Sequence, residues 1–178
     1  NPVRDLQIIL DELRLKDIEF VKKHLEGVEK VVKRGGQSLE VKNKKEEAAF
    51  IDRLLKYLED GKRVSNGTWT TKEVEIINSM FLLTAKPAIY LINLSERDYI
   101  RKKNKNLLAI KEWIDVNSPG DVIIPFSVSL EERLSHMETD EEREEELKKL
   151  GTTSALPKII LTMRKALHLI SYFTCGPG

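Results

Sequence analysis

Polar side chains suited to a purine ring follow two short apolar runs of this sequence. Asn93 and Glu96 come after the first run, and Ser127 directly follows the second. An amide can pair with adenine or read N7 of either purine, and a carboxylate accepts hydrogen bonds from exocyclic amines. Because ligands bind beyond the carboxyl ends of parallel strands, these side chains converge if the two runs are neighbouring strands. The pattern therefore predicts a pocket for the polar edge of a purine.

A plainer interpretation of the first loop stays open, in which Asn93 and Ser95 only cap a helix. No other residues have the spacing of a catalytic or metal-ligating group. The single cysteine, Cys175, argues against a disulfide framework and a Cys-rich zinc module. The three histidines stand far apart, which argues against a His-built metal site. We expect no catalytic residue and no metal ligand in this chain.

The apolar runs themselves indicate a parallel sheet. The first run, 88–92, is typical of a strand buried on both faces. The second, 122–126, contains Pro125, which fits best near a strand end because it lacks a backbone donor. Between the runs the pattern predicts one helix, capped by Ser95 and continuing to Ile114. The order strand, helix, strand is that of a βαβ unit.

Apolar residues at helical spacing extend from Leu6 to Val32 in the first part of the chain. The spacing slips between Leu13 and Ile18. One helix with a hinge at the slip, or two helices with Asp17 as an N-cap, would explain it.

A second amphipathic helix follows Gly35-Gly36, with Asn43 as the N-cap of a capping box and an end before Gly61. Two such helices joined by a short loop predict an antiparallel αα-hairpin. Each has a broad polar face, which indicates that the hairpin projects from the core.

Further helices are predicted from capping boxes at Thr70 and Ser129 and from the apolar spacing around Pro157. The acidic stretch 138–146 indicates either a solvated helix face or a mobile loop. Residues 171–175 have the composition of a strand start.

Composition excludes several classes of protein. Lys plus Arg is 30 and Asp plus Glu is 29 in 178 residues, so the formal net charge is +1. That balance argues against a globally basic nucleic-acid binder. No apolar run approaches the roughly 18 residues of a membrane span, and residues 1–11 lack the features of a signal peptide. We expect a cytoplasmic protein of about one domain, with no membrane partner.

The loop Asn93-Leu94-Ser95-Glu96 is similar to the guanine-specificity motif Asn-x-x-Asp of P-loop GTPases, in which Lys normally follows the Asn. With the basic stretch 97–105 behind it, this variant closely resembles the Obg-like ATPase family, the YchF subfamily of Obg-related P-loop proteins. Further stretches similar to the family occur in family order over nearly the whole chain, at residues 1–5, 34–36, 83–87, 124–127, 154–160 and 172–174.

The resemblance implies an α/β fold, the second half of a P-loop NTPase parallel sheet with its helices, plus an inserted helical coiled-coil hairpin. Residues 1–17 would be a nucleotide-domain helix, and 18–62 the coiled-coil insertion. Residues 63–175 would be the C-terminal half of the Obg-type G domain, and 176–178 a tail.

The resemblance also implies an ATP-preferring hydrolase that accepts GTP less well. In the family the Asn and the following apolar residue contact the adenine, which assigns that role to Asn93 and Leu94. Together with Ser95, Glu96 and Ser127 they form the expected base-binding set. A physical reason supports the preference. The shorter Asp of the guanine motif accepts from the N1–H and N2–H₂ donors of guanine, and Glu96 is one methylene longer than that Asp. A backbone carbonyl near Leu94 could accept from the adenine N6 amine.

The sequence departs from the family in what it lacks. No Gly-x-x-x-x-Gly-Lys-Ser/Thr occurs, so the phosphate cradle and the Mg²⁺-binding hydroxyl are missing, and Mg²⁺ is expected only with that portion. Val128 and Ser129 stand where the family usually has small residues. The chain is therefore expected to be an interior piece that works with the P-loop and TGS portions of the same protein. Alone it is not expected to hydrolyse ATP, because positioning the phosphates supplies most of the catalysis.

Basic residues leave a second function open. Those at 101–105 and those of the hairpin fit a solvated helix face, and they also fit a ribosome or rRNA contact, since ribosome association is known for the family. The alternative function is a non-catalytic helical interaction module, in which the hairpin binds the ribosome or another partner and the βαβ unit is only a scaffold.

Overall fold

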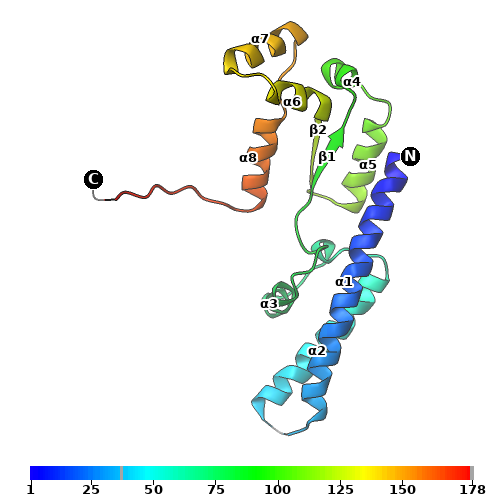
Figure 1. The fold of residues 1–178 in the computed structure, drawn as a ribbon. Helices are drawn as coiled ribbons and strands as arrows, with labels where there is room; N and C mark the ends of the chain where they lie inside the picture. The colour runs from blue at the N-terminus through cyan, green and yellow to red at the C-terminus, as the bar shows by residue number, and fades with distance from the viewer. Residues whose placement is uncertain (37, 177–178) are drawn as a thin grey trace. The chain divides into compact units, whose positions relative to one another are not determined.

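A computed structural model describes residues 1–36 and 38–176 (Figure 1). The chain divides into two compact units, Asn1–Pro87 and Ala88–Gly178, and each is described by itself. Among the described residues, no helix has both the length and the apolar character that a membrane span requires. The predicted tail, 176–178, lies outside the described residues except for Gly176.

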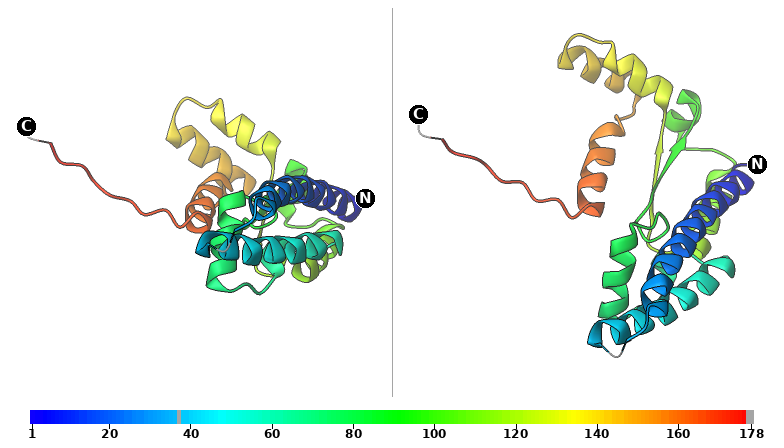
Figure 2. Two further views of the ribbon diagram at one scale, coloured as in Figure 1. Left: turned by 90° about the horizontal axis from the view of Figure 1, so that it is seen from below. Right: turned by 60° about the horizontal axis from the view of Figure 1, so that its bottom comes forward.

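The first unit is built on a helical hairpin of α1 (Pro2–Lys33) and α2 (Leu39–Glu59), which lie side by side in every view (Figures 1 and 2). Their facing apolar stripes form the core of this unit. Its centre is completely buried and includes Val21, Ile51 and Leu54. The predicted hairpin is therefore present.

The slip in the apolar spacing of α1 falls within one helix, as the first of the two predicted explanations has it, and the hinge at the slip stays a prediction. The helix is continuous, so the two-helix alternative is wrong and Asp17 is not an N-cap. Instead the Asp17 side chain is completely buried, and its two carboxylate oxygens accept hydrogen bonds from the backbone N–H groups of Leu83 and Thr84, each at 2.7 Å. A buried polar position inside an apolar stripe produces the slip. The domain boundary predicted between residues 17 and 18 falls inside this continuous helix and stays a prediction.

Helix α2 begins earlier than predicted, because Ser38 caps it rather than Asn43. The Ser38 hydroxyl accepts the Val41 N–H at 3.3 Å, so the helix is already formed when the chain reaches Asn43.

A short 3₁₀ turn, η1 (Val64–Asn66), and α3 (Thr71–Met80) complete the first unit. The capping box predicted at Thr70 is confirmed, with the Glu73 carboxylate accepting the Thr70 N–H at 2.8 Å. The turn is held by Trp69, whose indole N–H donates to the Val64 carbonyl at 2.8 Å.

The second unit contains the predicted parallel sheet, of β1 (Ile89–Asn93) and β2 (Val122–Phe126). Pro125 is the next-to-last residue of β2, as predicted. The burial on both faces expected for the first run is wrong at Leu91, which is 43% exposed. Each described strand has only one neighbour and so keeps an open edge.

The crossover between the strands consists of two helices where one was predicted, α4 (Glu96–Arg101) and α5 (Leu107–Asn117). Lys102 ends α4 in the left-handed region, with a φ of 53°. The Asn104 side chain then binds the Asp98 carboxylate at 2.8 Å, which stabilises the break.

Three helices follow β2: α6 (Val128–Ser135), α7 (Asp140–Leu150) and α8 (Leu156–Ala166). The predicted cap at Ser129 is wrong, because α6 starts earlier with Ser127 at its N-cap position. Most of the acidic stretch lies in α7, so of its two predicted alternatives the helix is confirmed and the loop is wrong. Residues 171–175 form no strand, since no described partner strand lies beside them. Helix α8 packs by Ile159 on the sheet face that carries Ile124.

Candidate functional site

The loops after β1 and β2 are joined directly to each other. The strand register pairs Asn93 with Phe126, so both loops leave the same end of the sheet. The Leu94 N–H donates to the Phe126 carbonyl at 2.9 Å, and the Asn93 Oδ1 accepts the Val128 N–H at 3.1 Å. The convergence expected for Asn93 and the second loop is therefore present, through the backbone of Val128.

This bond orients the Asn93 amide and leaves part of it unused. Asn93 is exposed, and among the described residues its Nδ2 has no hydrogen-bond partner. The Leu94 carbonyl likewise accepts no hydrogen bond from the described part of the chain. An amide donor and a backbone carbonyl acceptor thus stand on consecutive residues, a combination that suits a heterocycle with an acceptor beside an amine.

Leu94, unlike Asn93, is a buried residue. It is only 7% exposed and lines a hollow of about 360 Å³, together with Tyr99 of α4 and Ile124 of β2. Burial of the side chain fixes the backbone of Leu94, so its polar groups are held in place while its carbons pack inside.

The two predicted serine residues have structural partners. The Ser95 hydroxyl accepts the Asp98 N–H at 3.2 Å, as an N-cap does. Ser127 is completely buried, and its hydroxyl lies 3.0 Å from that of Ser129. The capping interpretation thus describes Ser95, and Ser127 supports the loop from inside.

The Glu96 carboxylate is already engaged. It forms an ion pair with Arg133 of α6, and Arg133 forms a second ion pair with Glu146 of α7. The hydrogen bond that Arg133 donates to Glu146, helped by the charge of Glu96, raises the pKa of its guanidinium above the ordinary value. Sequence reasoning missed Arg133, because it lies 37 residues from Glu96 and no local spacing connects them.

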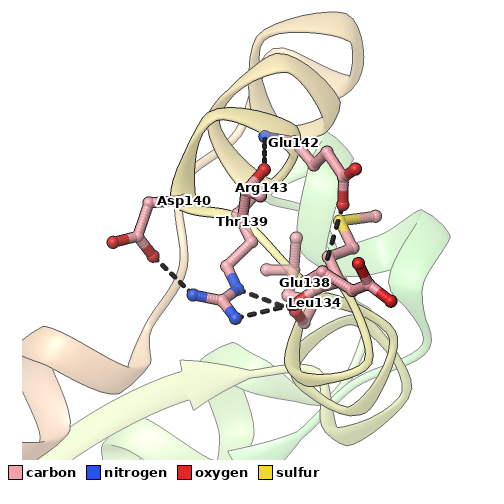
Figure 3. Close-up of polar contacts among 7 residues, drawn as sticks. Leu134, Glu138, Thr139, Asp140, Glu142 and Arg143 are labelled. Atoms are coloured by element: carbon pink, nitrogen blue, oxygen red, sulfur yellow. Dashed lines mark hydrogen bonds and ion pairs between the residues drawn. The ribbon is translucent and has the colours of Figure 1, made fainter.

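Helix α7 is held in position by a network at its first turn (Figure 3). The Arg143 guanidinium reaches back to α6 and donates to the carbonyls of Leu134, at 3.1 Å, and Met137, at 2.7 Å. It also pairs with Asp140, while the Thr139 hydroxyl caps α7 by accepting the Glu142 N–H at 3.2 Å. The turn between α6 and α7 is thereby fixed, which keeps Glu146 beside Arg133.

A further anchor ties the start of α8 to the same unit. The Glu131 carboxylate accepts hydrogen bonds from the Ser154 hydroxyl at 2.6 Å and the Ala155 N–H at 2.7 Å. The Tyr99 hydroxyl donates to the Thr153 carbonyl at 2.9 Å. Burial, reinforced by the charge of Glu131, raises the pKa of the Tyr99 phenol.

One kind of metal site is absent from the described residues, a cluster of acidic, histidine and cysteine side chains. These residues contain no group of three His, Cys, Asp or Glu side chains close enough to hold a metal ion.

Comparison with known proteins identifies the chain. No protein-family model matches the sequence. The sequence is 75% identical over 177 residues to Obg-like ATPase 1 of Saccharomyces cerevisiae, covering 99% of this chain and 45% of that protein. Obg-like ATPase 1 of Schizosaccharomyces pombe is 59% identical over 177 residues, with the same coverage. A solved structure of the S. pombe YchF GTPase superposes with a TM-score of 0.89 at 59% identity, over 99% of this chain and 47% of that one.

Fold and sequence together define part of a protein of the α/β class, with a parallel sheet flanked by helices. The chain belongs to the Obg-like ATPase family, also called YchF, which confirms the resemblance found in its motifs. It spans somewhat less than half the length of the curated relatives it matches.

Proposed function

We propose that the joined loops after β1 and β2 bind the adenine ring of ATP, and that the intact protein hydrolyses ATP in preference to GTP. The observation that carries the proposal is the bond from Val128 N–H to Asn93 Oδ1, because it occupies the oxygen of an exposed amide and leaves its Nδ2 donor without a partner among the described residues. The names of the relatives, ATPase and GTPase, support a nucleotide as the ligand.

The unused polar groups favour adenine over guanine. The Asn93 Nδ2 can donate to N7 of either purine. The Leu94 carbonyl can accept from the N6 amine of adenine, whereas guanine carries its O6 acceptor at the same place. Two acceptors facing each other leave both unpaired, which costs free energy when water is excluded.

Hydrolysis requires groups that the 178 residues do not carry. The motif that cradles phosphates and binds Mg²⁺ through a hydroxyl is absent from this sequence. We assign the phosphate cradle and the Mg²⁺ site to other parts of the intact protein. We assign base contact to Asn93 and Leu94, and support of their loops to Ser95, Glu96 and Ser127.

Calorimetric titration of the intact protein tests the proposal. Asn93→Ala is expected to weaken ATP binding by roughly 10- to 100-fold, because it removes one specific base contact and the bond that joins the two loops. Asn78→Ala is the matched control, because Asn78 is exposed on α3 in the other unit. Unchanged ATP affinity in Asn93→Ala, or a strong preference of the unaltered protein for GTP, would overturn it.

A second candidate function has its own observation, which is the basic tip of the hairpin. Lys30, Lys42 and Lys45 are exposed near the ends of α1 and α2. Such a cluster suits the phosphates of an RNA, with ribosomal RNA as the proposed partner. Replacing Lys42 and Lys45 together by Glu should reduce co-sedimentation with ribosomes, and unchanged co-sedimentation would leave the tip as a solvated surface.

A further inference from the structure

We propose that Arg133 sets the nucleotide preference of this site by occupying the Glu96 carboxylate. The inference rests on the proposed function, because it concerns which purine the same site selects. It makes Arg133 a positioning residue that acts through Glu96 rather than by touching the base.

The contacts of Arg133 suit that role. Its two terminal nitrogens divide between two carboxylates, Nη2 to Glu96 and Nη1 to Glu146. The three side chains come from α4, α6 and α7, so one guanidinium links the base-recognition loop to the two helices that follow β2. A planar guanidinium suits such double pairing better than a lysine does, because its donors form a rigid fork.

The ion pairs are partly shielded from water. The side chains of Glu96, Arg133 and Glu146 are 31%, 38% and 24% exposed. Shielding weakens the screening of the charges, and hydrogen bonds between ionised groups are stronger than neutral ones. The anchoring of α7 by Arg143 holds Glu146 in place, so Arg133 is oriented from one side and reaches Glu96 on the other.

An occupied carboxylate treats the two purines differently from a free one. Guanine presents N1–H and N2–H₂ donors, which a free carboxylate would accept. Adenine presents a lone pair at N1, which a free carboxylate would repel. Arg133 takes up acceptor positions of Glu96 and neutralises its charge, which weakens guanine binding and removes the penalty on adenine.

Nucleotide titration of the intact protein, with the ratio of GTP to ATP affinity as the readout, tests the role of Arg133. Arg133→Ala should raise that ratio by about tenfold, within the range of a base-specific carboxylate contact. Arg133→Lys should return most of the preference for ATP, because it keeps a cation within reach of Glu96. Lys111→Ala is the matched control, since Lys111 also pairs with a carboxylate, Asp115, but on the exposed surface of α5.

A double-mutant cycle shows whether Arg133 acts through Glu96. In a Glu96→Gln background, removing Arg133 should leave the GTP-to-ATP ratio unchanged, because no carboxylate remains to be released. A shift of the same size in that background would overturn the inference. Thermal unfolding without nucleotide, measured on each variant, separates a change of preference from a loss of folded protein.

A further variant shows whether the nucleotide preference depends on the pair of Arg133 with Glu96 or on its contact with α7. Glu146→Gln removes the charge of that partner but keeps an acceptor that can orient Arg133, and it leaves the pair with Glu96, so the ratio of GTP to ATP affinity should stay at the value of the unaltered protein or move towards ATP. A rise in the ratio equal to that of Arg133→Ala would overturn the inference. Failure of the proposed function can be told apart from either of these failures of the inference, because it appears as unchanged ATP affinity in Asn93→Ala.

Discussion

At the scale of single residues, the first unit depends on a buried carboxylate rather than on apolar contacts alone. Asp17 accepts two backbone N–H groups that no helix or strand satisfies. Buried donors without partners are costly, so this side chain fixes the segment after α3 against α1.

Asp17→Ala should lower the free energy of unfolding by about 3 kcal/mol, because it leaves two backbone donors unpaired in the interior. Urea denaturation measures the loss, and amide hydrogen exchange of Leu83 and Thr84 should show it locally. Asp52→Ala is the control, since Asp52 forms an exposed pair with Lys56 one turn along α2. Equal effects of the two substitutions would contradict the assignment.

A second residue, Tyr99, makes the free energy of unfolding depend on pH in the alkaline range. Its pKa is raised in the folded state, chiefly by burial, above the value of about 10 expected in the unfolded chain. The stabilisation is therefore complete below about pH 10 and is lost as the pH rises through the folded-state pKa.

Tyr99→Phe should lower stability at pH 7 by about 1 kcal/mol, through loss of the hydrogen bond to the Thr153 carbonyl. Above about pH 10 its stability should fall less steeply than that of the unaltered protein, because no phenol remains to ionise. Denaturation measured at several pH values checks this, and parallel curves for the two proteins would contradict it.

At the scale of elements, α7 is a charged helix whose placement depends on its ends. Its residues are mostly acidic, and none of them is buried. Packing therefore contributes little, and the cap at Thr139 with the Arg143 bonds to α6 holds it. This arrangement is what brings Glu146 to Arg133.

Thr139→Ala should destabilise α7 by about 1 kcal/mol, the typical value of an N-cap side chain. The amides of residues 140–146 should then exchange several-fold faster with solvent, while those of α8 keep their rates. Thr162→Ala serves as the control, because that hydroxyl donates to the Lys158 carbonyl within an already formed helix. Unaltered exchange in α7 would mean that Arg143 alone holds the helix.

At the scale of the whole molecule, the proposed function assigns base recognition and phosphate chemistry to different parts of the intact protein. The 178 residues contain the groups that we propose to bind adenine, and they contain no phosphate-cradling motif. Since phosphoryl transfer relies on positioned phosphates and Mg²⁺, the chain by itself should release no phosphate from ATP. A phosphate-release assay on the 178-residue chain, with the intact protein as positive control, checks this, and turnover by the chain alone would refute it.

Local patterns were sufficient for the hairpin and the strands of this fold, and less so for the bounds of its helices. Apolar spacing located the hairpin, and the bounded apolar runs located both strands, because periodicity and capping act within about four residues along the chain. The same patterns failed where one helix became α4 and α5, since the bond between Asn104 and Asp98 competes with helical continuity.

Contacts between distant residues were decided by the folded topology. Asp17 and Thr84 are 67 residues apart, and Glu96 and Arg133 are 37 apart, so no spacing along the chain relates them. The motif at Asn93 was visible in the sequence, but the orientation of its amide depends on the parallel pairing that brings Val128 beside it. Local residue types therefore specified which groups are present at the site, and tertiary pairing specified which of them remain free to bind a ligand.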